Sequence, residues 1–289
     1  MRFFLPVIVS AFFSLCGWGQ ALRVGFYNVE NLFDTINQVS LDDGDFTPEG
    51  SKAWNGAKYE AKKKALANAI SLFNPDVLGV CEVENYVVVR DLAQCTERLR
   101  GVVHYDSHDS RGIDVALLFD TSLMCLVASE PIFVGTIRRN LLRADFLVHS
   151  LGQVSWPLTI FVAHLPSKLG GKGAALRREL ALRVIDSLAG GVRYAVVVGD
   201  MNDSPRDQGV LYNCAYAPFE RGLGSYAYRD VWNMLDQILI TRTLLPFCGG
   251  EQHVVHRSEL LTLGGRWSSY PRRGEVSDHL PIFMDFKFQ

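Results

Sequence analysis

The stretch that decides the fold is residues 194–203, which reads YAVVVGDMND. Its first half is a valine-rich apolar run, which favours a buried β-strand because β-branched side chains pack well on a pleated surface. The run stops at Gly199, and Asp200 and Asn202 follow at once. A buried strand that ends in a carboxylate and an amide places both groups at the rim of a sheet. The pattern therefore predicts a strand whose carboxyl end carries polar chemistry.

Other apolar runs end in the same way. Polar groups stand at or just after the carboxyl end of further runs: Asn28 with Glu30 and Asn31, Glu82 with Glu84 and Asn85, Asp114 after Arg111-Gly112, His164, and Asp278-His279, while Asp236 opens another run. Taken singly, each group has an ordinary interpretation as a turn residue, a surface acid or a core histidine. Several rims that meet in one cleft would instead build an oxygen-rich site. Oxygen ligands without cysteine suit hard cations such as Mg²⁺, Mn²⁺ or Ca²⁺, and such a metal beside His and Asn donors suits attack on a phosphate ester.

Strands and helices alternate around these groups. Expected strands cover 22–29, 76–82, 113–119, 123–127, 142–149, 158–164, 194–199, 235–241 and 281–288, and expected helices cover 57–73, 85–99 and 173–188. The helix at 57–73 is expected to turn Lys62, Lys63 and Lys64 outward. The last strand alternates apolar Ile282, Met284 and Phe286 with other residues, which predicts a half-buried strand. No long linker, low-complexity tract or internal repeat appears, so we expect one α/β domain over residues 20–289 with a largely mixed or antiparallel sheet.

Composition excludes several classes of protein. The chain has 289 residues, 48% of them hydrophobic and 21% charged, which excludes a disordered, collagen-like or disulfide-dominated chain. Lys and Arg total 29 against 31 Asp and Glu, a net charge of −2. The chain is therefore no strongly basic nucleic-acid coat. A polyanionic substrate would need a local basic patch or a metal.

The N-terminus differs from the rest of the chain. Arg2 precedes an almost wholly apolar run over residues 3–13, and Gly17 and Gly19 follow as small residues at a cleavage site. This layout predicts a secretory signal peptide over residues 1–19 and a secreted or periplasmic protein. A buried strand, an uncleaved anchor or lipid attachment at Cys16 are the alternatives, and Leu15 before that cysteine disfavours the last. The run is too short to span a bilayer comfortably, since a span needs roughly 20 apolar residues, so we expect no stable membrane insertion of the mature chain.

The polar motifs together resemble the endonuclease/exonuclease/phosphatase superfamily, which includes deoxyribonuclease I. The matching segments are residues 28–33 (NVENLF), Glu82, residues 111–116 (RGIDVA), His164, residues 199–203 (GDMND), Leu235-Asp236 and residues 277–279 (SDH). They run across nearly the whole mature chain. Residues 163–168 (AHLPSK) with Gly170-Gly171 resemble secreted bacterial members in particular. The resemblance implies a four-layer α/β sandwich, in which helices flank two packed mixed β-sheets.

The resemblance also implies roles for the polar residues. Glu82 would be the main ligand of Mg²⁺, with Mn²⁺ or Ca²⁺ as other possibilities, and Asn28 and Asp278 would assist. Asp200 would orient or deprotonate the attacking water, with His279 as the rival general base, and Asn202 would hold a phosphate oxygen or the water. His164 and His279 would stabilise the phosphoryl oxygens, Asp236 would orient His164, and Asp278 would support His279 or the metal. Many members carry Asn where this chain has Ala163, so one phosphate-facing amide would be absent.

The resemblance leaves the substrate open. The residues expected to contact it are Arg111, Asp114, Lys168, Arg266, Arg272 and Arg273. The loop at 266–273 also holds Trp267 and Tyr270, and this aromatic and basic loop could grip a nucleic-acid backbone or a phosphorylated headgroup; an ordinary solvated loop is the alternative. We therefore expect a monomeric nuclease in preference to a phosphatase or phosphodiesterase that acts on inositol phosphates or lipid headgroups. A non-catalytic binding protein of the same fold is disfavoured because every core polar position is filled by a competent residue.

Overall fold

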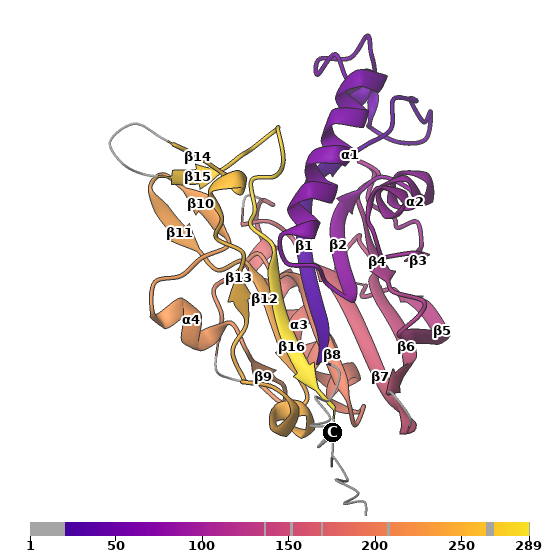
Figure 1. The fold of residues 1–289 in the computed structure, drawn as a ribbon. Helices are drawn as coiled ribbons and strands as arrows, with labels where there is room; N and C mark the ends of the chain where they lie inside the picture. The colour runs from indigo at the N-terminus through magenta and orange to yellow at the C-terminus, as the bar shows by residue number, and fades with distance from the viewer. Residues whose placement is uncertain are drawn as a thin grey trace, which may run out of the picture.

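The computed structural model describes residues 21–135, 137–150, 153–168, 170–206, 209–263 and 269–288. Within these residues, two six-stranded mixed β-sheets pack face to face (Figure 1). The first has the order β13 (His253–Val254), β16 (Ile282–Lys287), β1 (Ala21–Leu32), β2 (Val77–Val83), β4 (Asp114–Phe119) and β3 (Gly101–His104). The second has the order β5 (Met124–Ile132), β6 (Leu141–Ser150), β7 (Gln153–His164), β8 (Ala195–Asp200), β12 (Asp236–Ile240) and β9 (Tyr212–Asn213).

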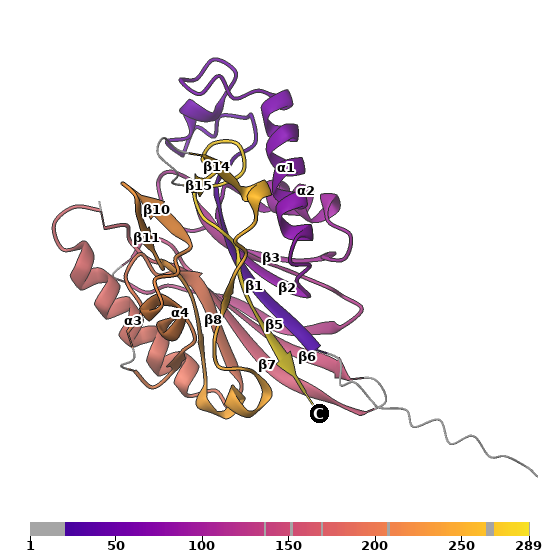
Figure 2. The ribbon, with the colours of Figure 1, turned by 60° about the vertical axis from the view of Figure 1, so that its left-hand side comes forward.

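Helices cover the outer face of each sheet (Figure 2). The helices α1 (Gly56–Ser71) and α2 (Tyr86–Cys95) pack on the first sheet, and α3 (Ala174–Gly190) packs on the second. Each layer boundary is an apolar cluster, and side chains such as Val24 and Val198 fill the space between the sheets. The predicted four-layer α/β sandwich of two mixed sheets flanked by helices is confirmed.

Short elements complete the described fold. They are the helices α4 (Tyr216–Glu220), η1 (Gly44–Phe46), η2 (Arg242–Phe247) and η3 (Ser258–Leu260), and the paired strands β10 (Tyr226–Tyr228) with β11 (Val231–Asn233) and β14 (Leu261–Leu263) with β15 (Ser269–Pro271). Among the described residues, no helix combines the length and apolar character needed to cross a bilayer. The predicted signal peptide at 1–19 lies outside the described residues.

The main elements agree with the sequence pattern, with some differences. The strands β3, β9 and β13 were not predicted, because each is too short to show a periodicity. The strand β5 runs to Ile132, beyond the expected end at 127. The helix expected at 85–99 ends at Cys95, since Thr96 adopts an extended backbone and its hydroxyl donates to the carbonyl of Ala93. Asn85 caps this helix by accepting from the amides of Val87 and Val88.

One face of α1 differs from its prediction. Lys62 and Lys63 are buried, with 4% and 6% of their surface exposed, and Lys64 alone of the three is exposed. Lys63 pairs with Glu60 at 2.7 Å on the side of α2, while the Lys62 ammonium donates to the carbonyl of Val276 at 2.7 Å. The expectation that all three lysines face solvent was wrong because the C-terminal segment covers Lys62 and α2 lies beside Lys63.

Strand register brings the polar ends together. The strands β7 and β8 are parallel, with His164 opposite Asp200, and the antiparallel β12 places Asp236 on the other side of Asp200. A Cβ on Gly199 would lie 2.3 Å from the carbonyl oxygen of Ala163. The glycine is therefore required where β7 and β8 approach most closely, just before the polar residues begin.

Candidate active site

The first sheet contributes Asn28 and Glu82 from adjacent strands. The register between β1 and β2 shifts after Asn28, and the backbone of Glu30, Asn31 and Glu82 has positive φ angles of 51°, 55° and 64°. Such irregularities re-aim side chains at the ends of strands and are frequent beside active sites. Here the amide of Asn31 donates to Glu82 Oε2 at 3.1 Å, so the irregularity fixes the Glu82 carboxylate at the rim.

The loop before β16 contributes Asp278 and His279. Ser277 holds this loop, because its hydroxyl donates to the carbonyl of Asn28 at 2.6 Å and accepts from the amide of His279 at 3.0 Å. Glu30 holds it a second time by accepting from the amide of Gly274 at 2.7 Å. The loop is therefore attached to the end of β1, although the two segments are far apart in the sequence.

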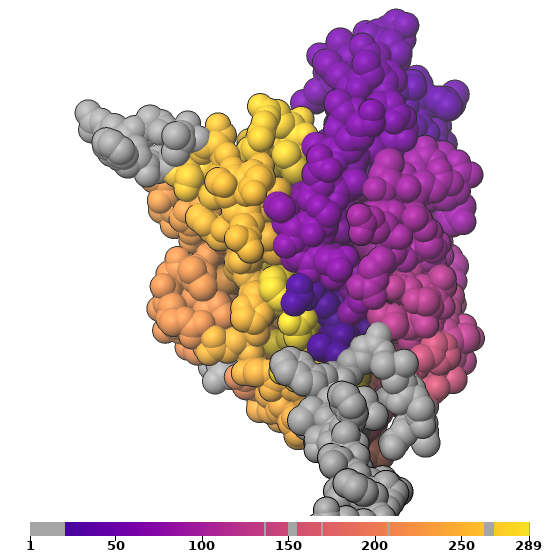
Figure 3. Space-filling view, viewed as in Figure 1, coloured from indigo at the N-terminus to yellow at the C-terminus, as the bar shows by residue number. Residues whose placement is uncertain are grey.

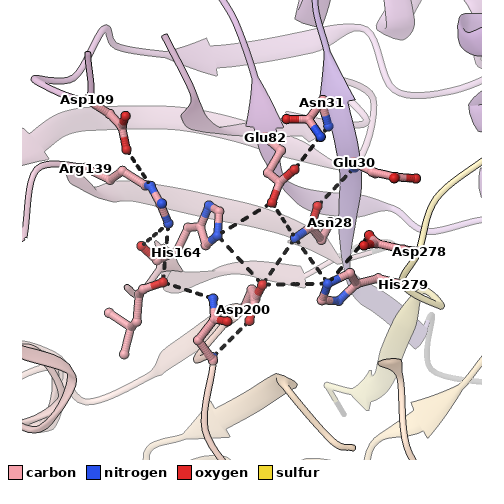
Figure 4. Close-up of polar contacts among 12 residues, drawn as sticks. Asn28, Glu30, Asn31, Glu82, Asp109, Arg139, His164, Asp200, Asp278 and His279 are labelled. Atoms are coloured by element: carbon pink, nitrogen blue, oxygen red, sulfur yellow. Dashed lines mark hydrogen bonds and ion pairs between the residues drawn. The ribbon is translucent and has the colours of Figure 1, made fainter. Parts of the chain in front are cut away.

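These groups converge on the amide of Asn28 (Figure 4). Its Nδ2 donates to Glu82 Oε1 and Asp200 Oδ2, both at 3.2 Å, and lies 3.5 Å from His279 Nε2. His164 Nε2 lies 3.7 Å from Asp200 Oδ2 and 3.9 Å from Glu82 Oε1. Five predicted residues from five separate segments thus face one another across a few ångströms.

Asp236 contacts His279 and not His164. Its Oδ2 lies 2.7 Å from His279 Nδ1, and both side chains are buried. Burial alone would lower the pKa of His279, but Asp236, followed by Asp200 and Asp278, raises this pKa to about 10. The expected Asp236–His164 contact was wrong because β12 is displaced from β7 by the whole width of β8.

His164 has a different environment. Its Nδ1 is buried and has no hydrogen-bond partner within the described residues. Burial, the Arg139 guanidinium and His279 hold the pKa of His164 well below its usual value. Arg139 is itself buried: it pairs with Asp109 at 3.0 Å and donates to the carbonyls of His164 and Leu165, each at 3.3 Å. His164 is therefore a neutral imidazole positioned through its backbone.

Asn202 and Ala163 also differ from the expectation. The amide of Asn202 donates to the carbonyl of Leu165 at 3.0 Å while its backbone donates to Asp200 Oδ1 at 2.9 Å, so Asn202 braces the His164 segment as well as lining the cleft. Ala163 is buried in the apolar cluster below α3. Its side chain does not face the cleft, so the lack of an amide there removes no group from the site.

Negative charge accumulates at the centre of the site. Burial raises the pKa of Asp200 well above the usual carboxyl range, with contributions from Asp236 and Glu82 that His279 and the amide of Asn202 oppose. Burial and Asp278 likewise raise the pKa of Glu30. Asp200, Asp236 and His279 each offer a ligand atom within 4.8 Å of the others. The oxygen-rich, thiol-free donor set fits a hard divalent cation.

The site opens into a cleft of about 1070 Å³. Its lining includes the basic residues Arg111 and Lys168 and two residues absent from the prediction, Arg138 and Arg177. Tyr226 and Tyr228 also line it, and the centre of the Tyr226 ring lies 4.9 Å from that of the His279 ring. The tyrosines come from the short hairpin β10–β11, which has no clear strand signal in the sequence.

Several residues expected to contact substrate lie elsewhere. Asp114 is buried outside the cleft lining, where it contacts His104 Nε2 at 3.2 Å and accepts from the amide of Ser107. Arg272 pairs with Glu275 and lines a separate groove beside α1. Arg273 reaches Glu30 at 3.3 Å and Asp278 at 3.9 Å but does not line the cleft. Arg266 and Trp267 lie outside the described residues.

Arg178 of α3 helps to hold the segment after β7. It is buried, and its Nη1 donates to the carbonyl of Pro166 at 3.1 Å. Together with Arg139 and Asn202, it brings donors to three consecutive carbonyls, those of His164, Leu165 and Pro166. The segment after β7 is therefore anchored by its backbone from several directions.

Comparisons with known proteins agree with this geometry. A family model described as the Endonuclease/Exonuclease/phosphatase family matches residues 23–287. Among curated protein sequences, no relative matches the chain.

Solved structures show the same fold. An endonuclease/exonuclease/phosphatase from Bacteroides vulgatus superposes with a TM-score of 0.62 at 16% identity, covering 93% of this chain and 100% of that one. TDP2 of D. rerio complexed with single strand DNA product has a TM-score of 0.59 at 18% identity, with 93% and 99% covered. A mannosyl-6-phosphatase of Bacteroides thetaiotaomicron has a TM-score of 0.58 at 15% identity, with 92% and 100% covered. At these identities the likeness shows the fold.

Proposed function

The chain belongs to the endonuclease/exonuclease/phosphatase family, and on this premise we propose that it is a divalent-metal-dependent phosphodiesterase with nucleic acid as its favoured substrate. The observation that carries the proposal is the convergence of Asn28, Glu82, His164, Asp200 and His279. Polar atoms of contacting pairs among them lie 3.2–3.9 Å apart, and all of them except the buried Asn28 line one cleft. If each of these residues had only a structural role, nothing would require their polar side chains to lie together.

Glu82, Asn28 and Asp278 are the residues that would hold the cation. The Glu82 side chain is 20% exposed and Asp278 21%, whereas Asp236 is 1% exposed and already bonded to His279. We therefore place the ion on the cleft side of the cluster and not between Asp236 and His279. A bound Mg²⁺ would supply charge neutralisation for the phosphoryl oxygens.

The remaining groups divide the other tasks. The raised pKa of Asp200 lies closer to neutral pH than that of an ordinary carboxyl group, which suits a base that orients a water and accepts its proton. With a pKa of about 10, His279 is protonated at neutral pH and acts as a charged donor toward a phosphoryl oxygen. His164 is neutral and offers a hydrogen bond from Nε2. This division favours Asp200 over His279 as the general base.

The lining of the cleft favours a polymeric diester. Besides the catalytic groups it holds four basic residues, Arg111, Arg138, Lys168 and Arg177, which suits several phosphates of one backbone. Tyr226 and Tyr228 offer rings on which a base or sugar can stack. The fold likeness to a mannosyl-6-phosphatase keeps a small phosphate ester, such as an inositol phosphate or a lipid headgroup, as the alternative substrate.

We also propose export of the chain, on the strength of the signal-peptide pattern at 1–19; that the chain is a monomer stays a prediction. Expression of the full-length chain in a Gram-negative bacterium followed by fractionation tests this. The mature chain, starting near residue 20, is expected in the periplasm or the medium. Retention of the full-length chain in the membrane fraction would argue for an anchor instead.

The decisive test is turnover of a substrate panel: plasmid DNA, single-stranded DNA, RNA, sphingomyelin, inositol phosphates and mannose 6-phosphate, with Mg²⁺, with Mn²⁺ and after chelation. We expect hydrolysis of nucleic acid with the metal and none after EDTA. E82Q should lose turnover on the order of 10³-fold while staying folded, because it removes the principal anionic ligand. E60Q, which makes the same substitution at an exposed position of α1, is the matched control. Activity that survives chelation, or full activity of E82Q, would contradict the proposal.

A further inference from the structure

The loop that carries Asp278 and His279 is held from two opposite sides. On the side of β1, Ser277 and Gly274 bond to Asn28 and Glu30. On the side of α1, the carbonyl of Val276 accepts from the Lys62 ammonium at 2.7 Å. Val276 precedes Asp278 by two residues. A shift at Val276 would therefore move the side chains that face Asp200 and the substrate.

The ammonium of Lys62 occupies an unusual environment. Lys62, Gly274 and Val276 line a groove of about 830 Å³ between α1 and the C-terminal segment, which lie beside each other in Figure 3. Lys62 is 4% exposed, and burial lowers its pKa. The carboxylates of Glu30, Asp278 and Glu82 counteract this effect. A buried cation is costly unless it is paired and hydrogen-bonded, so its position between this loop and the acidic cluster calls for an explanation beyond packing.

We propose that Lys62 is a positioning residue, whose ammonium fixes the loop at 274–279 so that Asp278 and His279 face Asp200. Its hydrogen bond to the Val276 carbonyl sets the position of the loop. Its charge interacts favourably with the carboxylates of Glu30, Asp278 and Glu82. Lys62 itself touches neither the phosphate nor the attacking water. The inference rests on the proposed function only for its kinetic consequence, since the loop geometry can be measured without turnover.

Lys63 is a matched comparison on the same helix. It is also buried, but its ammonium pairs with Glu60 at 2.7 Å and Asp91 at 3.7 Å and lies 4.3 Å from the centre of the Tyr59 ring. Both lysines stabilise α1 against its surroundings. If Lys62 served packing alone, the two should behave alike when their charge is removed.

The test compares K62M, K62R and K63M in the full mature chain. Kinetics on bis-p-nitrophenyl phosphate with Mg²⁺ should show kcat reduced at least tenfold in K62M with KM changed less than about twofold, because misplaced groups lose transition-state contacts first. K62R keeps the charge and the donor and should recover most of kcat. K63M should keep the wild-type kcat.

Amide hydrogen exchange gives a readout that does not depend on activity. K62M should speed exchange at 274–279, whereas K63M should affect only α1 and α2. If no phosphoester were hydrolysed by the wild type, the proposed function would fail while this difference would still support the positioning role. Unchanged exchange at 274–279 in folded K62M, or equal effects of K62M and K63M on kcat, would overturn it. If K62M does not fold, K62Q is judged by the same criteria.

Discussion

His164 and His279 flank the same carboxylate but in opposite electrostatic states. Their Nε2 atoms lie 3.7 and 3.9 Å from Asp200 Oδ2. His279 is bonded to Asp236 and its pKa is raised to about 10, whereas His164 lies near Arg139 and its pKa is held well below the usual value. One histidine is therefore a charged donor and the other a neutral one. The comparison shows that equal distance from a site does not imply an equal role.

The way each histidine is held also differs. His164 ends a strand, and buried donors from Arg139, Asn202 and Arg178 bind the carbonyls of its segment. His279 lies on a loop whose side chains and amides bond to the end of β1 and to α1. Among the residues that the structure describes, the His164 ring has no partner at Nδ1, while His279 is oriented through its own ring. The predictions below separate these two arrangements.

Removal of each imidazole is expected to have the largest effect. H279A should reduce kcat on the order of 10³-fold and H164A on the order of 10²-fold, because loss of a charged donor to the phosphoryl group costs more than loss of a neutral one. KM should change less in both. H256A, at an exposed position, is the control. Wild-type kcat in either variant would assign that histidine a purely structural role, and a reversed order would contradict the charge assignment.

D236N should change the titration of His279 more than that of His164, because the Asp236 carboxylate contacts His279 directly. Loss of the adjacent charge should lower the pKa of His279 by about one to three units, measured from its imidazole NMR signals. The pKa of His279 is higher in the folded state than in the unfolded state, where it is near 6.5. The resulting stabilisation is fully present below pH 6.5 and is lost as the pH rises through about 10. The wild type should therefore lose more stability than D236N between pH 6.5 and 10 in thermal unfolding. Parallel curves would contradict this.

R139M should act on the His164 side alone. Removing the guanidinium frees the carbonyls of His164 and Leu165 and leaves Asp109 with Arg111 as its remaining charged partner. We expect kcat to fall about tenfold and unfolding free energy to fall by about 3 kcal/mol, measured in urea. R143M, which removes an exposed pairing with Glu130 and Asp145, is the control. A shift of the His279 signals in R139M would show that the two sides are not independent.

The smallest effect is expected from the walls of the cleft. Combined R111Q and K168Q should raise KM for an oligonucleotide a fewfold and reduce its salt dependence by about one slope unit per lost phosphate contact. Hydrolysis of bis-p-nitrophenyl phosphate should stay near wild type. R272Q should change neither value, because Arg272 lines the groove beside α1. A raised KM in R272Q would instead indicate that the loop at 266–273 contacts the substrate, as the sequence predicted.

Local pattern determined which residues could do chemistry. Apolar runs that end in polar residues marked His164 and Asp200, and Asp278-His279 stands just before the apolar run of the last strand. Such signals are local, because neighbouring residues show both where a buried strand lies and where it ends. The alternating burial of β16 was predicted for the same reason and is confirmed. The motif order was enough to indicate the family and, through it, the four-layer sandwich.

Only the tertiary structure decided which of these groups are partners. Asp236 bonds to His279 across 43 positions of sequence and Lys62 to Val276 across 214, and no local period records such pairings. The three consecutive lysines of α1 look alike in sequence, yet Lys62 faces the loop at 274–279, Lys63 faces α2 and Lys64 faces solvent. The physical reason is that strand order and the packing of distant segments set the surroundings of a side chain, and the surroundings set its charge state and its role.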